Sequence, residues 1–130
     1  MIKLEAQDLI SAKSVANKGN SYGFGGITFV YHDKGKRIEF SNRVVQKLKN
    51  PTHIKFCFTD EYLILISVNE TEDGANALKN MCKRKVIYNA NLIKETFEHF
   101  DINYKEQTSF TFNDIEAVDG IENAIAVKIK

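Results

Sequence analysis

A ten-residue pattern occurs twice in this chain, because residues 36–45 match residues 84–93 at a constant offset of 48 positions (84 − 36). Each copy has two bases, an apolar–any–aromatic triplet, a small polar residue and then an apolar pair. Self-similarity at a fixed spacing is typical of duplicated units that bury their apolar faces together. The repeat therefore predicts an α+β fold of two related strand–helix–strand–strand halves, residues 27–68 and 84–130, sharing one β-rich core.

Length and composition fit one domain over residues 1–130. The chain is 43% hydrophobic and 27% charged, which is ordinary for a globular protein of this size. Acidic residues interrupt the first ten positions, so we expect no signal peptide. No apolar run approaches the roughly 20 residues that span a bilayer. We expect a cytoplasmic protein with no membrane partner.

Alternation and capping signals predict the elements of the first half. A helix over residues 3–16 ends at Gly19, and a glycine-rich loop covers residues 19–26. A hairpin of strands 27–32 and 36–40 then precedes a short helix, which Ser41 or Asn42 caps and which ends before Pro51. Strands at 53–58 and 62–68 follow, and the second is apolar enough to be covered on both faces.

The second half is predicted to repeat this order after a short helix over residues 75–83. The elements that follow are a strand at 86–88, a helix capped by Asn89 or Asn91 and running through Phe100, and strands at 107–113 and 124–129. Ile115 and Val118 extend the first of these closing strands, and the turn between them contains Asp119 and Gly120.

The net charge of +1 conceals an uneven distribution. Basic residues gather at the start of each repeat, and acidic residues gather from residue 95 onward. Lys and Arg neutralise phosphates, and Arg also reads guanine edges. The candidate nucleic-acid-binding residues are Lys36, Arg37, Arg43, Lys83, Arg84 and Lys85. The alternative is that these clusters are ordinary solvated surface, because 18 bases against 17 acids is not the strongly basic balance of a typical nucleic-acid binder.

The first repeat resembles the swapped-hairpin β-barrel family of AbrB-type bacterial regulators and MraZ. The matching positions are Gly35, Arg37, Ile38, Phe40, Val44 and Leu48, followed by strands 54–58 and 62–66 around Asp60 and Glu61. The sequence departs from the family pattern at Ser41, where the family often has Pro, at Val45, where it often has Arg, and at Thr96, where the first repeat has Leu. No glycine precedes Arg84 as Gly35 precedes Lys36.

This resemblance implies a barrel-like fold and a bacterial or phage DNA-binding regulator or antitoxin-like module that works as a homo-oligomer on duplex DNA. It implies DNA contacts by Lys36 and Arg37, and more weakly by Arg84 and Lys85.

Other chemistries find little support in the sequence. The loop at residues 21–26 precedes a strand and lacks the Lys-Ser/Thr ending of a phosphate-binding loop. His32, His53 and His99 lack metal-ligand spacing, so we expect no metal and no cofactor. Cys57 and Cys82 form no disulfide framework and have no evident catalytic partner.

Two alternatives to a regulator remain open. One is a structural or adaptor protein of a phage or mobile element, which binds a protein partner through an edge strand or the acidic half. The other is an enzyme, which should show a deep pocket with convergent polar groups. A regulator should place its bases on one continuous face, whereas an adaptor could scatter them.

Overall fold

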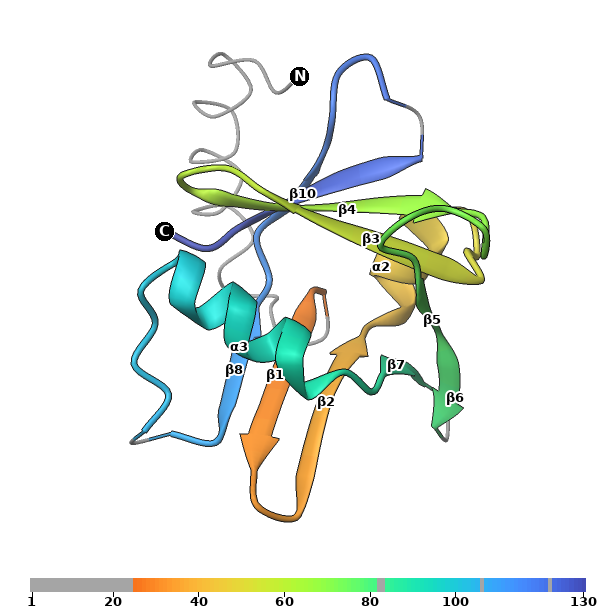
Figure 1. Cartoon of the computed structure of the whole chain (residues 1–130). Coiled ribbons are helices and arrows are strands. Elements are labelled where there is room, and N and C mark those ends of the chain that lie inside the picture. Colours follow the sequence, from red (N-terminus) through yellow and green to blue (C-terminus); the bar gives the residue numbers. More distant parts are fainter. Residues whose placement is uncertain (1–24, 82–83, 106, 122) are drawn as a thin grey trace.

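Two five-stranded antiparallel sheets face each other in a computed structural model, and the two helices of the described residues pack beside them (Figure 1). The structure describes residues 25–81, 84–105, 107–121 and 123–130. The predicted helix over residues 3–16 and most of the glycine-rich loop lie outside these residues. Sheet A contains, in spatial order, β6 (Lys79–Met81), β7 (Arg84–Ile87), β2 (Gly35–Phe40), β1 (Ile27–His32) and β8 (Ser109–Phe112). Sheet B contains β5 (Asn76–Ala77), β3 (His53–Phe58), β4 (Tyr62–Val68), β10 (Ala124–Lys128) and β9 (Ile115–Ala117).

The main core lies between the sheets and takes side chains from both halves of the chain. Phe29 and Phe40 come from sheet A, and Leu63 and Leu65 come from sheet B, all 0% exposed. The helices α2 (Asn42–Lys47) and α3 (Ala90–His99) add their apolar faces to this core. The sheets do not close into a barrel, since each has its own edge strands.

Four of the five strands in each sheet are ordered symmetrically about a pair of neighbouring strands. The central pairs, β2 with β7 and β4 with β10, each join one strand from either half in antiparallel register. Next to them stand β1 and β6 in sheet A, and β3 and β9 in sheet B. The order β1–β2–α2–β3–β4 is thus followed by β6–β7–α3–β9–β10, with β5 and β8 added at edges.

The predicted caps of both helices form. Ser41 Oγ accepts a hydrogen bond from the Val44 N–H at 3.3 Å, and Asn89 Oδ1 accepts one from the Leu92 N–H at 3.0 Å. These bonds satisfy backbone donors that have no partner within the helix. Helix α2 ends at Leu48, before Pro51, and α3 ends at Phe100. The strands predicted at 27–32, 53–58 and 62–68 also form with those bounds.

Two predicted elements are wrong. Residues 75–83 were expected to form a helix, yet the structure has β5 paired with β3 and β6 paired with β7. Hydrogen bonding to β3 and β7 outweighs a weak local helical pattern. Residues 107–118 were expected to form one extended strand, yet they form β8 and β9, which lie in different sheets. The chain crosses between the sheets at Asn113 and Asp114, so β9, and not β8, is the counterpart of β3.

Candidate functional site

The β1–β2 hairpin extends beyond the strands that flank it (Figure 1). Strand β1 pairs with β8 only through Val30, and β2 pairs with β7 only from Ile38 onward. Residues 32–37 are called the hairpin tip below. The part of β2 in this tip pairs only with β1: Gly35 lies opposite His32, Lys36 opposite Tyr31 and Arg37 opposite Val30. A free two-stranded ribbon is left at one end of sheet A.

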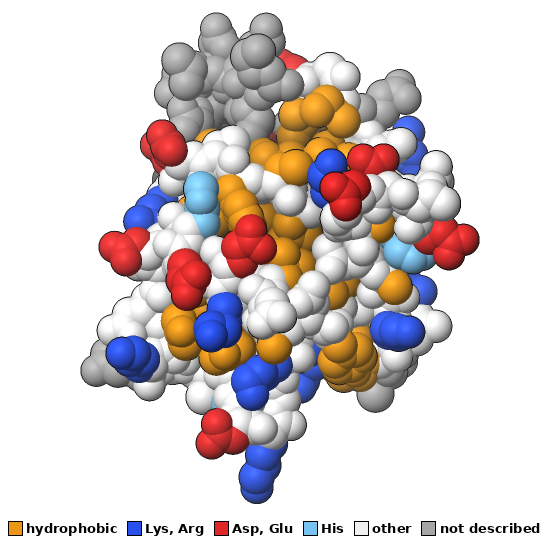
Figure 2. All heavy atoms as spheres, in the orientation of Figure 1, with side chains coloured by type: hydrophobic (Ala, Val, Ile, Leu, Met, Phe, Trp, Pro, Cys, Tyr) orange, Lys and Arg blue, Asp and Glu red, His pale blue; other side chains and the backbone are white. Residues whose placement is uncertain are grey.

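The hairpin tip carries basic residues on both of its faces. Lys36 stands opposite Tyr31, with its Nζ 5.3 Å from the centroid of the Tyr31 ring on the core side. Because neighbouring side chains of a strand point to opposite faces, Arg37 points to the outer face of sheet A. Lys34 is exposed in the turn beside Asp33. Figure 2 shows Lys and Arg side chains gathered toward this lower end, with acidic side chains mostly above them.

Aromatic packing fixes the base of the hairpin. The Tyr31 ring makes edge contacts with Tyr104 and Phe97, at centroid distances of 5.2 Å and 6.3 Å. The Tyr31 N–H also donates to the Thr108 carbonyl oxygen at 2.8 Å. Phe97 lies on α3, so the helix and the chain after it support the ribbon where it leaves the sheet.

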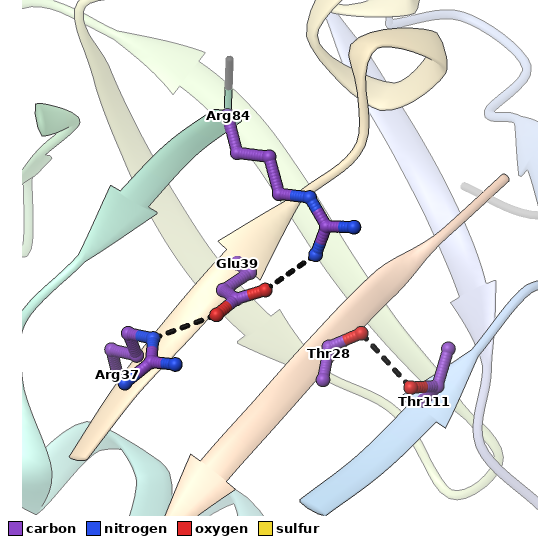
Figure 3. Close-up of polar contacts among 5 residues, drawn as sticks. All are labelled: Thr28, Arg37, Glu39, Arg84 and Thr111. Carbon is purple, nitrogen blue, oxygen red and sulfur yellow. Dashed lines mark hydrogen bonds and ion pairs between the residues drawn. The ribbon is translucent and has the colours of Figure 1, made fainter. Parts of the chain in front are cut away.

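Two arginines from different halves meet at one carboxylate on the outer face of sheet A (Figure 3). Arg37 Nε donates to Glu39 Oε2 at 2.6 Å, and Arg84 Nη1 donates to Glu39 Oε1 at 2.6 Å. Glu39 is only 8% exposed. On the same face, Thr28 and Thr111 pair through their hydroxyls at 2.9 Å across β1 and β8. Sequence reasoning missed Glu39, although its i, i+2 spacing from Arg37 places both on one strand face.

The two arginines decide the ionisation of Glu39. Burial raises the pKa of its carboxyl, but hydrogen bonds and charge attraction from Arg37 and Arg84 outweigh burial and lower the pKa below its ordinary 4.5. The carboxylate is therefore ionised at neutral pH and offsets part of the positive charge on this face.

Replacing Glu39 with Gln should destabilise the fold at neutral pH by about 1–3 kcal/mol, because the two arginines lose the negative charge and one of the two acceptor oxygens. The folded-state pKa lies below the unfolded one, so the contribution of Glu39 is present above the ordinary pKa and is lost as pH falls through the folded value. The stability difference between about pH 7 and about pH 3 should therefore be smaller in Glu39→Gln than in the wild type, as measured by urea unfolding.

Glu72→Gln is the matched control for that experiment. Glu72 pairs with Lys55 at 3.4 Å on an exposed surface, and its loss should cost no more than about 0.5 kcal/mol. Equal effects of Glu39→Gln and Glu72→Gln would show that the Glu39 cluster contributes no more to the free energy of unfolding than an exposed ion pair does.

The structure separates the other predicted bases. Lys85 stands opposite Phe40, so it points away from the outer face, and its Nζ donates to Asn80 Oδ1 at 2.6 Å. Arg43 is exposed on α2, and a Cβ added to Gly25 would lie 2.7 Å from its Nη1. Lys83 lies outside the described residues. Arg37 and Arg84 thus share one face, whereas Lys36 and Lys85 lie on the opposite side of sheet A.

A cavity of about 460 Å³ lies away from these bases, between the loops that flank β3 and β4. It is lined by Lys49, Asn50, Pro51, Thr52, Ser67, Val68, Asn69, Glu72 and Asn123. Within residues 25–81, 84–105, 107–121 and 123–130, no three His, Cys, Asp or Glu side chains are grouped to hold a metal ion. Over the same part of the chain, no helix has the length and apolar character that crossing a membrane requires.

Comparison with protein-family models, with curated proteins and with solved structures finds no match to this chain.

Proposed function

We propose that this chain is a non-enzymatic protein that binds duplex DNA through the hairpin tip. The observation that carries the proposal is a projecting two-stranded ribbon with bases on both faces: Lys36 on one, Arg37 on the other, and Lys34 in the turn. Asp33 is the one acidic residue of the tip. Such a ribbon can meet phosphates on either side of a groove while its end approaches the base edges.

The dimensions of the ribbon suit the major groove of B-form DNA. That groove is about 12 Å wide and about 8.5 Å deep and admits a two-stranded β-ribbon. Strands in a ribbon lie about 4.8 Å apart, and three residues of a strand rise by about 10 Å. The three tip residues of β2, Gly35 to Arg37, therefore span about the depth of the groove. A five-stranded sheet would be too broad to enter, so the extension of this hairpin beyond β7 and β8 matters.

The symmetric strand order supports a relation to AbrB-type regulators and MraZ, whose units are built from interlocked hairpins. Here β2 with β7 and β4 with β10 join the two halves of one chain. On this proposal the chain is a regulator or antitoxin-like module of a bacterium or phage that acts in the cytoplasm, as a homo-oligomer on DNA.

The test is fluorescence anisotropy with a random duplex of about 20 base pairs at about 50 mM and about 200 mM salt. Three phosphate contacts give a slope of log affinity against log salt of about −2.7, so binding should weaken roughly 40-fold between these conditions. Lys34→Ala/Lys36→Ala/Arg37→Ala should remove most of this slope, because it removes the three bases of the tip.

The matched control is Lys47→Ala/Lys49→Ala/Lys130→Ala, which also removes three exposed bases but leaves the hairpin unchanged. Equal loss of binding in both triple variants would mean that only net charge matters and would reject the hairpin as the contact.

No binding of the wild type at low salt would reject DNA as the partner and favour an adaptor that binds protein. One observation supports that second candidate. Tyr88, between β7 and α3, is 58% exposed, and exposed tyrosines are frequent anchors of protein interfaces.

A further inference from the structure

The outer face of sheet B carries a second apolar cluster, separate from the main core. Its buried members are Tyr62, Ile64, Val118, Ala124 and Ala126, which are 1–8% exposed, and Cys57 and Ile66 pack against them. Alternation explains the two clusters, because β4 directs Leu63 and Leu65 into the main core and Tyr62 and Ile64 to the opposite face. Antiparallel sheets commonly have one solvated face, yet this sheet is apolar on both.

Neither described helix covers this outer face. The buried side chains of α2 and α3, among them Val44, Val45 and Phe97, belong to the main core. Over residues 25–81, 84–105, 107–121 and 123–130, no helical side chain belongs to the second cluster. Side chains that are nearly inaccessible to water need a covering layer.

Chain length and connectivity make residues 1–24 the candidate for that layer. Four segments lie outside the described residues: 1–24, 82–83, 106 and 122. Of these, residues 1–24 have the length to cover a sheet face. Residues 1–24 lead into Gly25 and Gly26. The backbone of Gly26 lies so close to Phe112 and Asn113 that an added Cβ would be 1.7 Å from the Phe112 carbonyl oxygen. Asn113 is two residues before β9, an edge strand of sheet B. The described chain therefore begins near the connection that leads into an edge of sheet B.

The segment and the face are complementary in size and chemistry. A helix over residues 3–16 would be about 21 Å long, close to the width of five strands spaced about 4.8 Å apart. It would supply Leu4, Leu9, Ile10 and Val15 as apolar side chains. The small Ala124 and Ala126 leave room on β10 for larger residues from a packed element. Glu116 stands opposite Ala126 on β9, and the segment contains Lys3, Lys13 and Lys18.

We propose that residues 1–24 dock on the outer face of sheet B and form a third layer of the same molecule. The docking surface is Tyr62, Ile64, Ala124 and Ala126, with Cys57 at its border. This inference is independent of the proposed DNA binding, because the hairpin tip belongs to sheet A.

The first test uses Cys57 as a reporter in a Cys82→Ser background, so that one thiol remains. Leu9→Asp/Ile10→Asp places two charges in the segment and leaves the sheet sequence unchanged. If the segment covers the face, this variant should react with a thiol reagent at least about tenfold faster and should bind a hydrophobic dye. Gln46→Asp/Lys47→Asp, on the exposed side of α2, is the matched control and should leave both readouts unchanged.

The second test uses the intact chain and needs no destabilising change. A photo-crosslinking residue at position 10 should form cross-links to peptides from β4 and β10 of the same molecule. Cross-links to sheet A, or cross-links only between copies in a mixture of isotope-labelled and unlabelled chains, would overturn the proposal. Unchanged Cys57 reactivity and dye binding in Leu9→Asp/Ile10→Asp would overturn it as well.

Discussion

Replacing Phe97 with alanine is expected to lower the free energy of unfolding by about 3–5 kcal/mol. Phe97 is 0% exposed and stands at the centre of an aromatic group. Its ring lies 5.0 Å from Phe110, 5.3 Å from Tyr104 and 5.6 Å from Phe29, measured between centroids. These partners come from β8, the chain after α3, and β1, so one truncation leaves a cavity that several elements share.

The measurement is equilibrium urea unfolding followed by far-UV circular dichroism, with Tyr88→Ala as the control. Tyr88 is also aromatic but 58% exposed, and its truncation should cost no more than about 0.5 kcal/mol. If Phe97→Ala does not fold, Phe97→Leu, which leaves a smaller cavity, is measured in its place. The decrease in unfolding free energy for Phe97→Leu should lie between those for Phe97→Ala and Tyr88→Ala. Similar midpoints for Phe97→Leu and Tyr88→Ala would show that the aromatic group is not central to stability.

Replacing Gly26 with alanine is expected to lower the free energy of unfolding by at least about 3 kcal/mol, similar to the effect of Phe97→Ala. An added Cβ would lie 1.7 Å from the Phe112 carbonyl oxygen and 2.7 Å from the Asn113 Cα. Both are backbone atoms, so no side-chain rotation can relieve the overlap, and β1 and the β8–β9 connection must move apart. The strain acts where the chain crosses from sheet A to sheet B.

Gly35→Ala at the other end of the hairpin is the matched control. Its added Cβ would lie 3.0 Å from Arg37 Nη1, the far end of a flexible side chain that can move. Thermal unfolding should show a fall in Tm of roughly 10 °C or more for Gly26→Ala and little change for Gly35→Ala. Equal Tm values for the two variants would mean that the β8–β9 connection yields easily, and that Gly26 is not a tight point of the fold.

The strands predicted from alternation and the two helix caps depend on local chemistry. Tyr62–Val68 forms a strand because its apolar residues suit both faces of a sheet, and Ser41 and Asn89 cap helices because their side-chain oxygens reach backbone N–H groups three residues on. Strand alternation and helix capping each involve about ten neighbouring residues or fewer. All the interacting groups therefore lie within one short stretch of the sequence.

The candidate site was only partly visible in the sequence. The basic pairs at residues 36–37 and 84–85 were apparent, and strand alternation implies that the members of each pair point to opposite faces. That Arg37 and Arg84 both reach Glu39 depends on the pairing of β2 with β7, which joins residues 45 positions apart. The extension of the hairpin tip likewise depends on where β7 and β8 stop pairing with it.

By itself, the sequence determined where β1 to β4 and α3 form. Only the tertiary structure decided that residues 76–81 become edge strands, that β8 and β9 enter different sheets, and that two arginines share one carboxylate. The physical reason is that local pattern sets the conformation of a segment, whereas the partner and register of a strand are set by hydrogen bonds and packing with residues far away in the chain.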